Sequence, residues 1–197
     1  MDNDLFRGNL VRLTLESPEA EVPNVVRWWQ DSEYMRLLDN DPARLWSQKK
    51  IREWIDKDLE EENPSVFFFH VHTLQDDRPI GFVGLFNISW TNGDAWVGIG
   101  MGARDTWGRG YGTDAMRLAL RYAFTELNLR RVSLGVFEYN RRAIRSYMKA
   151  GFTHEGRLRQ ALQREGRRWD LYLMGLLKSE WQAQQDRTQA ETSERAI

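Results

Sequence analysis

Three alternating glycines mark the segment with the clearest capacity for chemistry. It reads Trp-Gly-Arg-Gly-Tyr-Gly-Thr over residues 107–113, after a strand-like run and before an amphipathic one. Glycines allow positive φ and place no Cβ between a backbone amide and a ligand. The first turn of a helix leaves N–H groups unpaired, and its dipole favours an anion there. The pattern therefore predicts a pyrophosphate-binding loop, to which Arg104 and Arg109 could add charge. The alternative is a turn that only reverses the chain.

Two other phosphate-binding motifs fit this sequence poorly. A P-loop needs a lysine before its closing Ser or Thr, and Gly112-Thr113 has none. Residues 98–103 match the dinucleotide pattern G-x-G-x-x-A, but that pattern must follow a strand and open a helix. Residues 98–101 are themselves strand-like, and the next helix starts only near Gly110. We interpret the match as accidental.

A second group of candidate residues shares one helix face. Asn140, Ala143 and Tyr147 are spaced i, i+3, i+7 in a helix expected over 140–150. Asn140 is placed to cap its start and Gly151 to end it in the left-handed conformation. Ala143 leaves room for a ligand beside Tyr147. The alternative roles are a cap alone for Asn140 and core packing for Tyr147.

The elements that must position these residues indicate a mixed α/β (α+β) fold. Helical spacing predicts helices over 22–38, 47–61, 112–127 and 140–150. Runs rich in β-branched and aromatic residues predict strands over 10–15, 66–73, 80–90, 95–101, 132–137, 152–158 and 169–177. This order predicts a largely antiparallel, seven-stranded sheet flanked by about four helices. We expect one domain over residues 1–181 and a polar, flexible tail over 182–197.

Composition narrows the class of protein. Lys and Arg total 28 and Asp and Glu total 29, so no basic field is expected for nucleic acid or for an anionic membrane. No apolar stretch approaches the roughly 18 residues of a membrane span, and the acidic N-terminus predicts no signal peptide. Cysteine is absent, which excludes a cysteine nucleophile and fits a reducing cytoplasm. His70 and His72 lack a third ligand nearby, so we expect strand-surface histidines and no metal site.

Taken together, residues 107–113 and the run Asn-Arg-Arg-Ala-Ile-Arg-Ser-Tyr-Met-Lys-Ala-Gly-Phe over 140–152 resemble the GCN5-related N-acetyltransferases (GNAT). The branch that they resemble contains ribosomal-protein and spermidine acetyltransferases, and the resemblance extends over residues 10–181. It implies a cytoplasmic enzyme that transfers an acetyl group from acetyl-CoA to a primary amine of a peptide N-terminus, a polyamine or another small molecule. The alternative is an inactive CoA-binding sensor or interaction module. Homodimer formation is left open.

The resemblance also implies roles for individual residues. Backbone amides of 109–113 would hold the pyrophosphate, and the pantetheine arm would lie between the strands ending at Met101 and Phe137. The implied coenzyme contacts are Ile99, Met101, Arg104, Gly108, Arg109, Gly110, Tyr111, Gly112, Thr113, Asn140, Ala143 and Ser146. Tyr147 would protonate or hydrogen-bond the leaving thiolate. The amine site would be walled by Tyr34, Met35 and residues 38–46, with Trp46, Trp90 and Trp96 as aromatic groups.

The general base is expected away from the family's usual positions. Many relatives carry Glu in the strand before the loop, where this chain reads Ala-Trp-Val-Gly over 95–98. Others carry Glu before the Val of the next strand, where this chain has Gly135. We therefore expect Glu138 or a water chain to take the proton from the amine. The other interpretation of Glu138 is a solvated charge paired with Arg141 or Arg142. Asp94, Ser89 and His154 are weaker alternatives.

Overall fold

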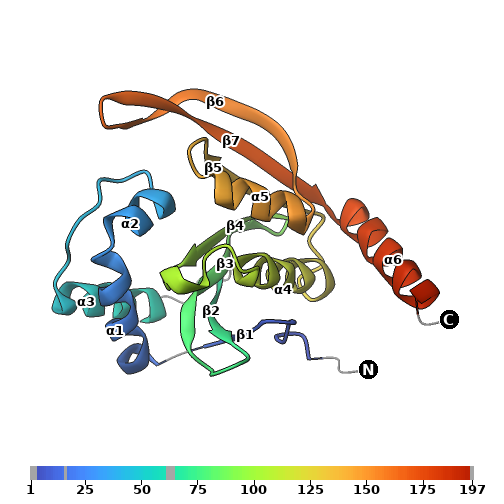
Figure 1. Ribbon diagram of the computed structural model, residues 1–197, viewed down its shortest axis with the longest axis horizontal. Helices are drawn as coiled ribbons and strands as arrows, with labels where there is room; N and C mark the ends of the chain where they lie inside the picture. Colours follow the sequence, from blue (N-terminus) through green and yellow to red (C-terminus); the bar gives the residue numbers. More distant parts are fainter. Residues whose placement is uncertain (1–3, 16, 61–64, 196–197) are drawn as a thin grey trace.

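A seven-stranded sheet forms the centre of the molecule (Figure 1). The computed structural model describes residues 4–15, 17–60 and 65–195 and orders the strands β1-β2-β3-β4-β5-β7-β6. The strands are β1 (Val11–Thr14), β2 (Phe67–Thr73), β3 (Pro79–Ser89), β4 (Asp94–Met101), β5 (Arg131–Phe137), β6 (Thr153–Arg164) and β7 (Arg167–Leu177). Every neighbouring pair is antiparallel except β4 and β5, which are parallel. The fold class expected from the sequence is confirmed.

Helices pack on both faces of the sheet. One layer holds α1 (Pro18–Trp29), α2 (Ser32–Leu38) and α3 (Gln48–Glu60), and the other holds α4 (Tyr111–Thr125) and α5 (Arg141–Ala150). Side chains of β4 alternate between these layers. A Cβ added to Gly100 would point at Tyr34 of α2. The side chains of Ile99 and Met101 lie instead near Gly112 at the start of α4. The sheet therefore separates an α1–α3 layer from an α4–α5 layer.

The segment predicted as one helix over 22–38 consists of two helices. Asp31 interrupts it, because its carboxylate accepts hydrogen bonds from the backbone N–H groups of Glu33 and Tyr34 and so caps a new helix. With α6 added, the described residues form six α-helices rather than about four.

The residues expected to form a polar, flexible tail over 182–197 are helical as far as they are described, since α6 runs over Lys178–Arg195. Its first turns are anchored: the ring of Trp181 lies 5.4 Å from that of Phe124, and the side-chain amide of Gln184 donates to the Gly151 carbonyl at 3.5 Å. Its Gln, Ala, Arg and Glu residues favour a helix intrinsically. Since they form no apolar stripe, the hydrophobic period that predicts helices was missing here.

The main core lies between α4 and the sheet, where Met116, Leu120 and Phe124 are fully buried. Burying each of these side chains contributes about 1.5–3 kcal/mol. A second, smaller cluster joins α1 to α3 through Val22, Val25, Ile51 and Ile55. The two helix layers thus have separate hydrophobic clusters.

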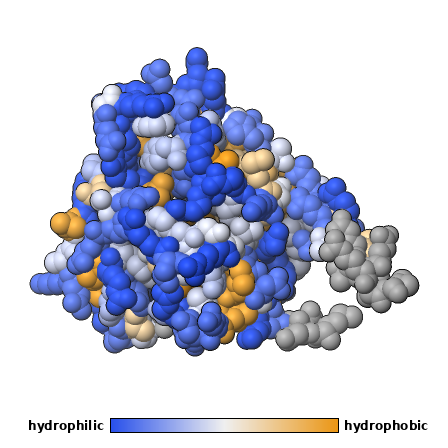
Figure 2. Space-filling model, viewed as in Figure 1, coloured by the Kyte–Doolittle hydropathy of each residue, from blue (hydrophilic) through white to orange (hydrophobic). Residues whose placement is uncertain are grey.

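A membrane-spanning helix requires a long stretch of hydrophobic residues. The face seen in Figure 2 is mostly hydrophilic, with small and separated hydrophobic areas. Within the described ranges, no helix is both long and apolar enough to cross a bilayer.

Candidate functional site

Strands β4 and β5 diverge after three residue pairs. They are in register at Asp94–Arg131, Ala95–Val132 and Trp96–Ser133, yet β4 continues to Met101 and β5 to Phe137. The expected divergence of these strands is therefore present. Beyond Trp96, the edge of β4 that faces β5 has no strand against it in the described part of the chain. A backbone edge of this kind can pair with an extended ligand.

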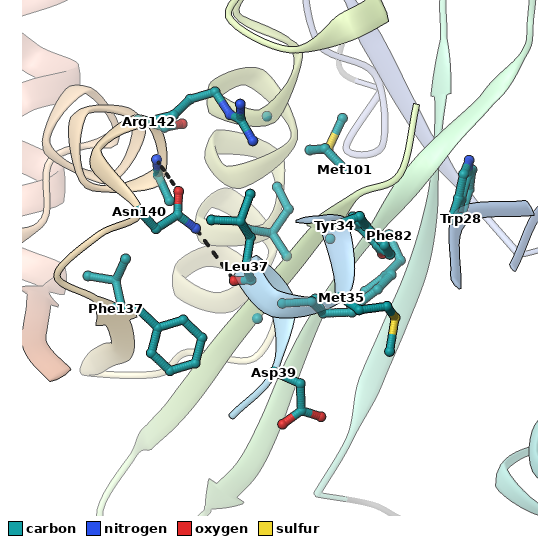
Figure 3. A pocket seen from close by; sticks show the side chains of 18 of the residues that line it. Trp28, Tyr34, Met35, Leu37, Asp39, Phe82, Met101, Phe137, Asn140 and Arg142 are labelled. Carbon is teal, nitrogen blue, oxygen red and sulfur yellow. Dashed lines mark hydrogen bonds between the residues drawn. The ribbon is translucent and has the colours of Figure 1, made fainter. Parts of the chain in front are cut away.

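A cavity of about 760 Å³ lies at this opening and reaches both helix layers. Figure 3 shows Asn140 and Arg142 on one side of it and Trp28, Tyr34 and Phe82 on the other. Ten predicted coenzyme or catalytic residues line it: Ile99, Met101, Gly108, Gly110, Gly112, Thr113, Asn140, Ala143, Ser146 and Tyr147. The structure thus brings together most of the residues singled out in the sequence.

The glycine loop has the conformation that its sequence predicts. Gly108 and Gly110 have φ of +76° and +94°, and Gly110 caps α4 in the left-handed conformation. A Cβ on Gly108 would meet nothing within 4 Å, so backbone conformation rather than space requires glycine there. The open amides of the first turn of α4 therefore border the cavity.

Helix α5 presents the polar face expected of it. The Asn140 side-chain oxygen accepts from the backbone N–H of Ala143 at 3.2 Å, and Gly151 ends the helix at φ +109°. Both predicted caps are confirmed. The Asn140 amide also donates to the Leu37 carbonyl at 3.5 Å, which links α5 to α2 (Figure 3). Tyr147 lines the cavity beside Phe152, and burial raises the pKa of its phenol to about 12.

The same helix supplies three cations that were not among the predicted site residues. Arg142, Arg145 and Lys149 line the cavity, spaced i, i+3 and i+7. The Arg142 guanidinium lies 3.7 Å from the centre of the Trp107 ring. Trp107 in turn donates from Nε1 to the Met101 carbonyl at 2.6 Å. Trp107 therefore braces the loop against the end of β4.

Four predicted site residues are missing from the described lining of the cavity: Arg104, Arg109, Tyr111 and Glu138. Arg104 pairs with Asp31 and, at 2.8 Å, with Glu33, so its charge is neutralised by α2, while its guanidinium lies 5.2 Å from the centre of the Trp107 ring. Glu138 turns to β7, where its carboxylate accepts the backbone N–H of Asp170 at 3.1 Å.

The α1–α3 side of the cavity is aromatic. Its rings belong to Trp28, Trp29, Tyr34, Trp46, Phe68, Phe82 and Phe86. Of the three tryptophans expected at the amine site, Trp46 lines the cavity. Trp90 and Trp96 are 51% and 44% exposed and are not among the described residues that line it.

Three glycines of the β4 region make room for these rings. A Cβ on Gly98 would lie 3.2 Å from the Phe86 ring, and one on Gly100 would lie 2.5 Å from the Phe82 ring. A Cβ on Gly102 would overlap the ring of Trp28. This alternation explains the G-x-G-x-x-A match: its first two glycines lie in a strand under aromatic side chains, and the expectation of an accidental match holds.

Acidic groups add to this wall. Glu21, Asp39 and Asp41 line the cavity, and Glu21 Oε1 lies 2.9 Å from Nε2 of the buried His70. The expectation of surface histidines is wrong, since His70 and His72 are each only 5% exposed. His70 faces Glu21 of α1, and His72 Nδ1 lies 2.9 Å from the carbonyl oxygen of Asp77 in the turn between β2 and β3. No group of three potential metal ligands occurs within the described ranges.

The β6–β7 hairpin contacts both α2 and the loop between α2 and α3. The tip of the β6–β7 hairpin reaches over α2 (Figure 1), and Arg164 donates to the carbonyls of Asp39 and Asp41 at 2.8 Å each. Arg36 of α2 pairs with Glu165 of the same tip at 2.9 Å.

Comparison with known proteins supplies the family. Residues 12–153 match the acetyltransferase (GNAT) domain. The chain belongs to the GNAT acetyltransferase family. A protein named uncharacterized N-acetyltransferase p20 from Bacillus licheniformis is 32% identical over 171 residues, covering 86% of this chain and 95% of that protein. Spermidine N(1)-acetyltransferase of Escherichia coli K12 is 30% identical over 139 residues, covering 66% and 71% of the two chains.

A solved structure supports the fold of this acetyltransferase. Spermidine N-acetyltransferase from Vibrio cholerae, in complex with CoA and spermine, matches with a TM-score of 0.76 at 24% identity. The match covers 87% of this chain and 97% of that one. The resemblance carried by residues 107–113 and 140–152 is confirmed.

Proposed function

We propose that this acetyltransferase transfers the acetyl group of acetyl-CoA directly to a primary amine of a small molecule. The observation that carries the proposal is the cavity at the opening between β4 and β5. A glycine loop, an unpaired strand edge and cations meet at one side, and aromatic rings and carboxylates meet at the other. Polyamines are the first acceptors to test, because relatives are named spermidine acetyltransferases.

The coenzyme would be held mainly by backbone. Amides of residues 109–113 would bind the pyrophosphate at the N-terminus of α4, and Arg142, Arg145 and Lys149 would add positive charge. The pantetheine arm would pair with β4 at Ile99 and Met101. A hydrogen bond of 2.8 Å between Thr113 and Ser146 joins α4 to α5 and fixes both walls of this half.

Tyr147 would assist the leaving thiolate. Its pKa of about 12 keeps the phenol protonated at neutral pH. An ordinary thiol has a pKa near 8.5, so the phenol holds its proton more tightly than the thiol would. This order favours a hydrogen bond from Tyr147 to the sulfur over complete proton transfer.

The acceptor would enter from the α1–α3 side. Aromatic faces attract an ammonium group, and the carboxylates of Glu21, Asp39 and Asp41 lie on the same wall. The amine must lose a proton before attack, since its pKa lies near 10. Because the carboxylate of Glu138 is held by Asp170, we propose a water chain in place of Glu138 as the route for that proton.

Release of free thiol from acetyl-CoA, measured with spermidine, butylamine and a dipeptide as acceptors, tests the proposal. Transfer to at least one small amine is expected. Coenzyme at a hundred times its dissociation constant should also stabilise the fold by about 2.7 kcal/mol. A melting temperature that rises with acetyl-CoA, without thiol release by any amine, would instead support a CoA-binding sensor. A cytoplasmic location and a possible second copy in a homodimer belong to the same proposal, and mass measurement in solution tests the dimer.

A further inference from the structure

One polar group in the aromatic wall has no protein partner. Tyr34 lines the cavity and is only 3% exposed, yet its hydroxyl makes no hydrogen bond within the described ranges. A buried hydroxyl without a partner is unfavourable, and such groups are uncommon in folded proteins. A ligand in the cavity would satisfy this one.

The hydroxyl lies over the part of β4 that borders the opening. A Cβ on Gly100 would be 2.6 Å from Tyr34 Oη and 2.5 Å from Phe82 Cε1, so both rings cover that glycine. Figure 3 shows Tyr34 and Phe82 together on this side. Gly100 belongs to the stretch of β4 that has left β5. Tyr34 therefore covers this part of β4 from α2, while Tyr147 lines the cavity from α5.

Helix α2 is held at both ends, which fixes the hydroxyl in place. At its start, Asp31 accepts the backbone N–H of Tyr34 at 3.2 Å and pairs with Arg104. At its end, the Tyr139 hydroxyl donates to the Arg36 carbonyl at 2.6 Å. A group held this firmly is suited to orienting a substrate.

We infer that the Tyr34 hydroxyl binds the acceptor. Its oxygen accepts a hydrogen bond from an N–H of the nitrogen that attacks the thioester. This inference rests on the proposed function. A neutral primary amine has two N–H donors and one lone pair. If one N–H points to Tyr34 Oη, the lone pair is free to face the carbonyl carbon.

The position of the hydroxyl favours the acceptor over the coenzyme. The pantetheine arm would lie along the edge of β4, in the plane of the sheet. Tyr34 lies above that plane, in the layer that holds the aromatic rings and Glu21. Burial raises the pKa of Tyr34 well above its ordinary value, so the phenol stays neutral and its oxygen can accept.

The test deletes only the hydroxyl, with Tyr34→Phe. The protein is saturated with CoA, which carries no acetyl group, and titrated with spermidine and with butylamine by calorimetry. We expect amine affinity to fall about tenfold or more, CoA affinity to stay within about twofold, and the ligand-free melting temperature not to fall. Tyr139→Phe is the matched control, because it removes a phenol hydroxyl that does bond within the protein. That variant should melt lower.

Several results would overturn the inference. They are equal amine affinity in Tyr34→Phe and wild type, an equal loss of CoA affinity, a melting temperature lowered as in Tyr139→Phe, or a wild type that binds neither amine. The proposed function fails separately. A wild type that binds an amine but releases no thiol from acetyl-CoA would refute acetyl transfer and leave the role of Tyr34 in binding intact.

Discussion

The two halves of the cavity are built by different means. The side proposed to hold the coenzyme is formed by backbone amides, positive-φ glycines and an open strand edge within residues 97–113, with one face of α5 beside them. The side proposed to hold the acceptor is formed by side chains from α1, α2, β2, β3 and the loop over 39–46. The first half depends on local conformation, and the second depends on how distant segments meet.

This difference predicts how each half tolerates change. A site made of backbone is sensitive to residues that alter φ and less sensitive to the chemistry of side chains. A site made of side chains can change specificity through single substitutions without loss of the fold. Acceptor choice should therefore be the more variable property of this protein.

The largest effect is expected for Gly110→Val, which attacks the backbone half. A β-branched residue at φ +94° is strained, and its Cβ would press on Leu10 Cδ1 at 3.3 Å, so the backbone of the loop must shift. We expect the rise in melting temperature with acetyl-CoA to disappear and turnover to fall by at least about 100-fold.

Gly156→Val is the matched control for that change. A Cβ on Gly156 would meet nothing within 4 Å, and this glycine does not have positive φ. Retention of the acetyl-CoA shift by both variants would contradict a backbone cradle at Gly110.

Tyr147→Phe separates chemistry from binding within the coenzyme half. Because Tyr147 would donate a hydrogen bond to the developing thiolate, turnover should fall by about 10²–10³-fold with little change in CoA affinity. Because the pKa of Tyr147 is raised to about 12, its phenol stays protonated through pH 10, so wild-type turnover should show no alkaline decline from this group. Unchanged turnover in the variant, measured by thiol release across pH 6–10, would make Tyr147 a packing residue.

Gly100→Ala tests the aromatic wall. The new methyl group would press on Tyr34 and Phe82 at about 2.5 Å, so the rings must shift. We expect acceptor KM to rise by about tenfold. Gly98→Ala is milder, since its methyl would meet only Phe86, at 3.2 Å. Equal KM values in the two variants would argue against a strict position for Tyr34.

The smallest effect concerns the anchor of α2. Asp31→Ala removes the helix cap and the pair with Arg104 and should cost about 1–2 kcal/mol in unfolding free energy, whereas Asp31→Asn keeps a capping group and should cost less. The Arg104 guanidinium lowers the pKa of Asp31. The pair therefore stabilises the fold above the ordinary carboxyl pKa and is lost as pH falls through the lowered value. Urea unfolding at pH 7 and in acid measures both effects.

The coenzyme half was largely predictable because its signals are local. The loop over 107–113, the caps Asn140 and Gly151, and the lining residue Tyr147 follow from spacing along short segments. The cations of α5 were missed although they have helical spacing, since exposed Arg and Lys residues are common on helices and nothing in the sequence distinguishes these.

The acceptor half was predictable only in outline. The sequence places Tyr34, Met35 and Trp46 at the wall, and they line the cavity. It does not reveal that Phe82 and Phe86 join them, which depends on the register of β3 and β4. Nor does it reveal that Glu138 turns to β7, because the backbone N–H of Asp170 lies 32 positions away in sequence.

The divergence of β4 from β5 determines which backbone amides exchange their hydrogens quickly with solvent. In the described part of the chain, β4 and β5 are in register over three residue pairs, from Asp94–Arg131 to Trp96–Ser133. Amides of Val97–Met101 that point into the opening should exchange quickly with solvent in the free protein, while those bonded to β3 stay protected. Because the coenzyme arm would complete that edge as a strand does, its arrival should slow exchange there first, and the substrate would then act as a missing piece of the fold.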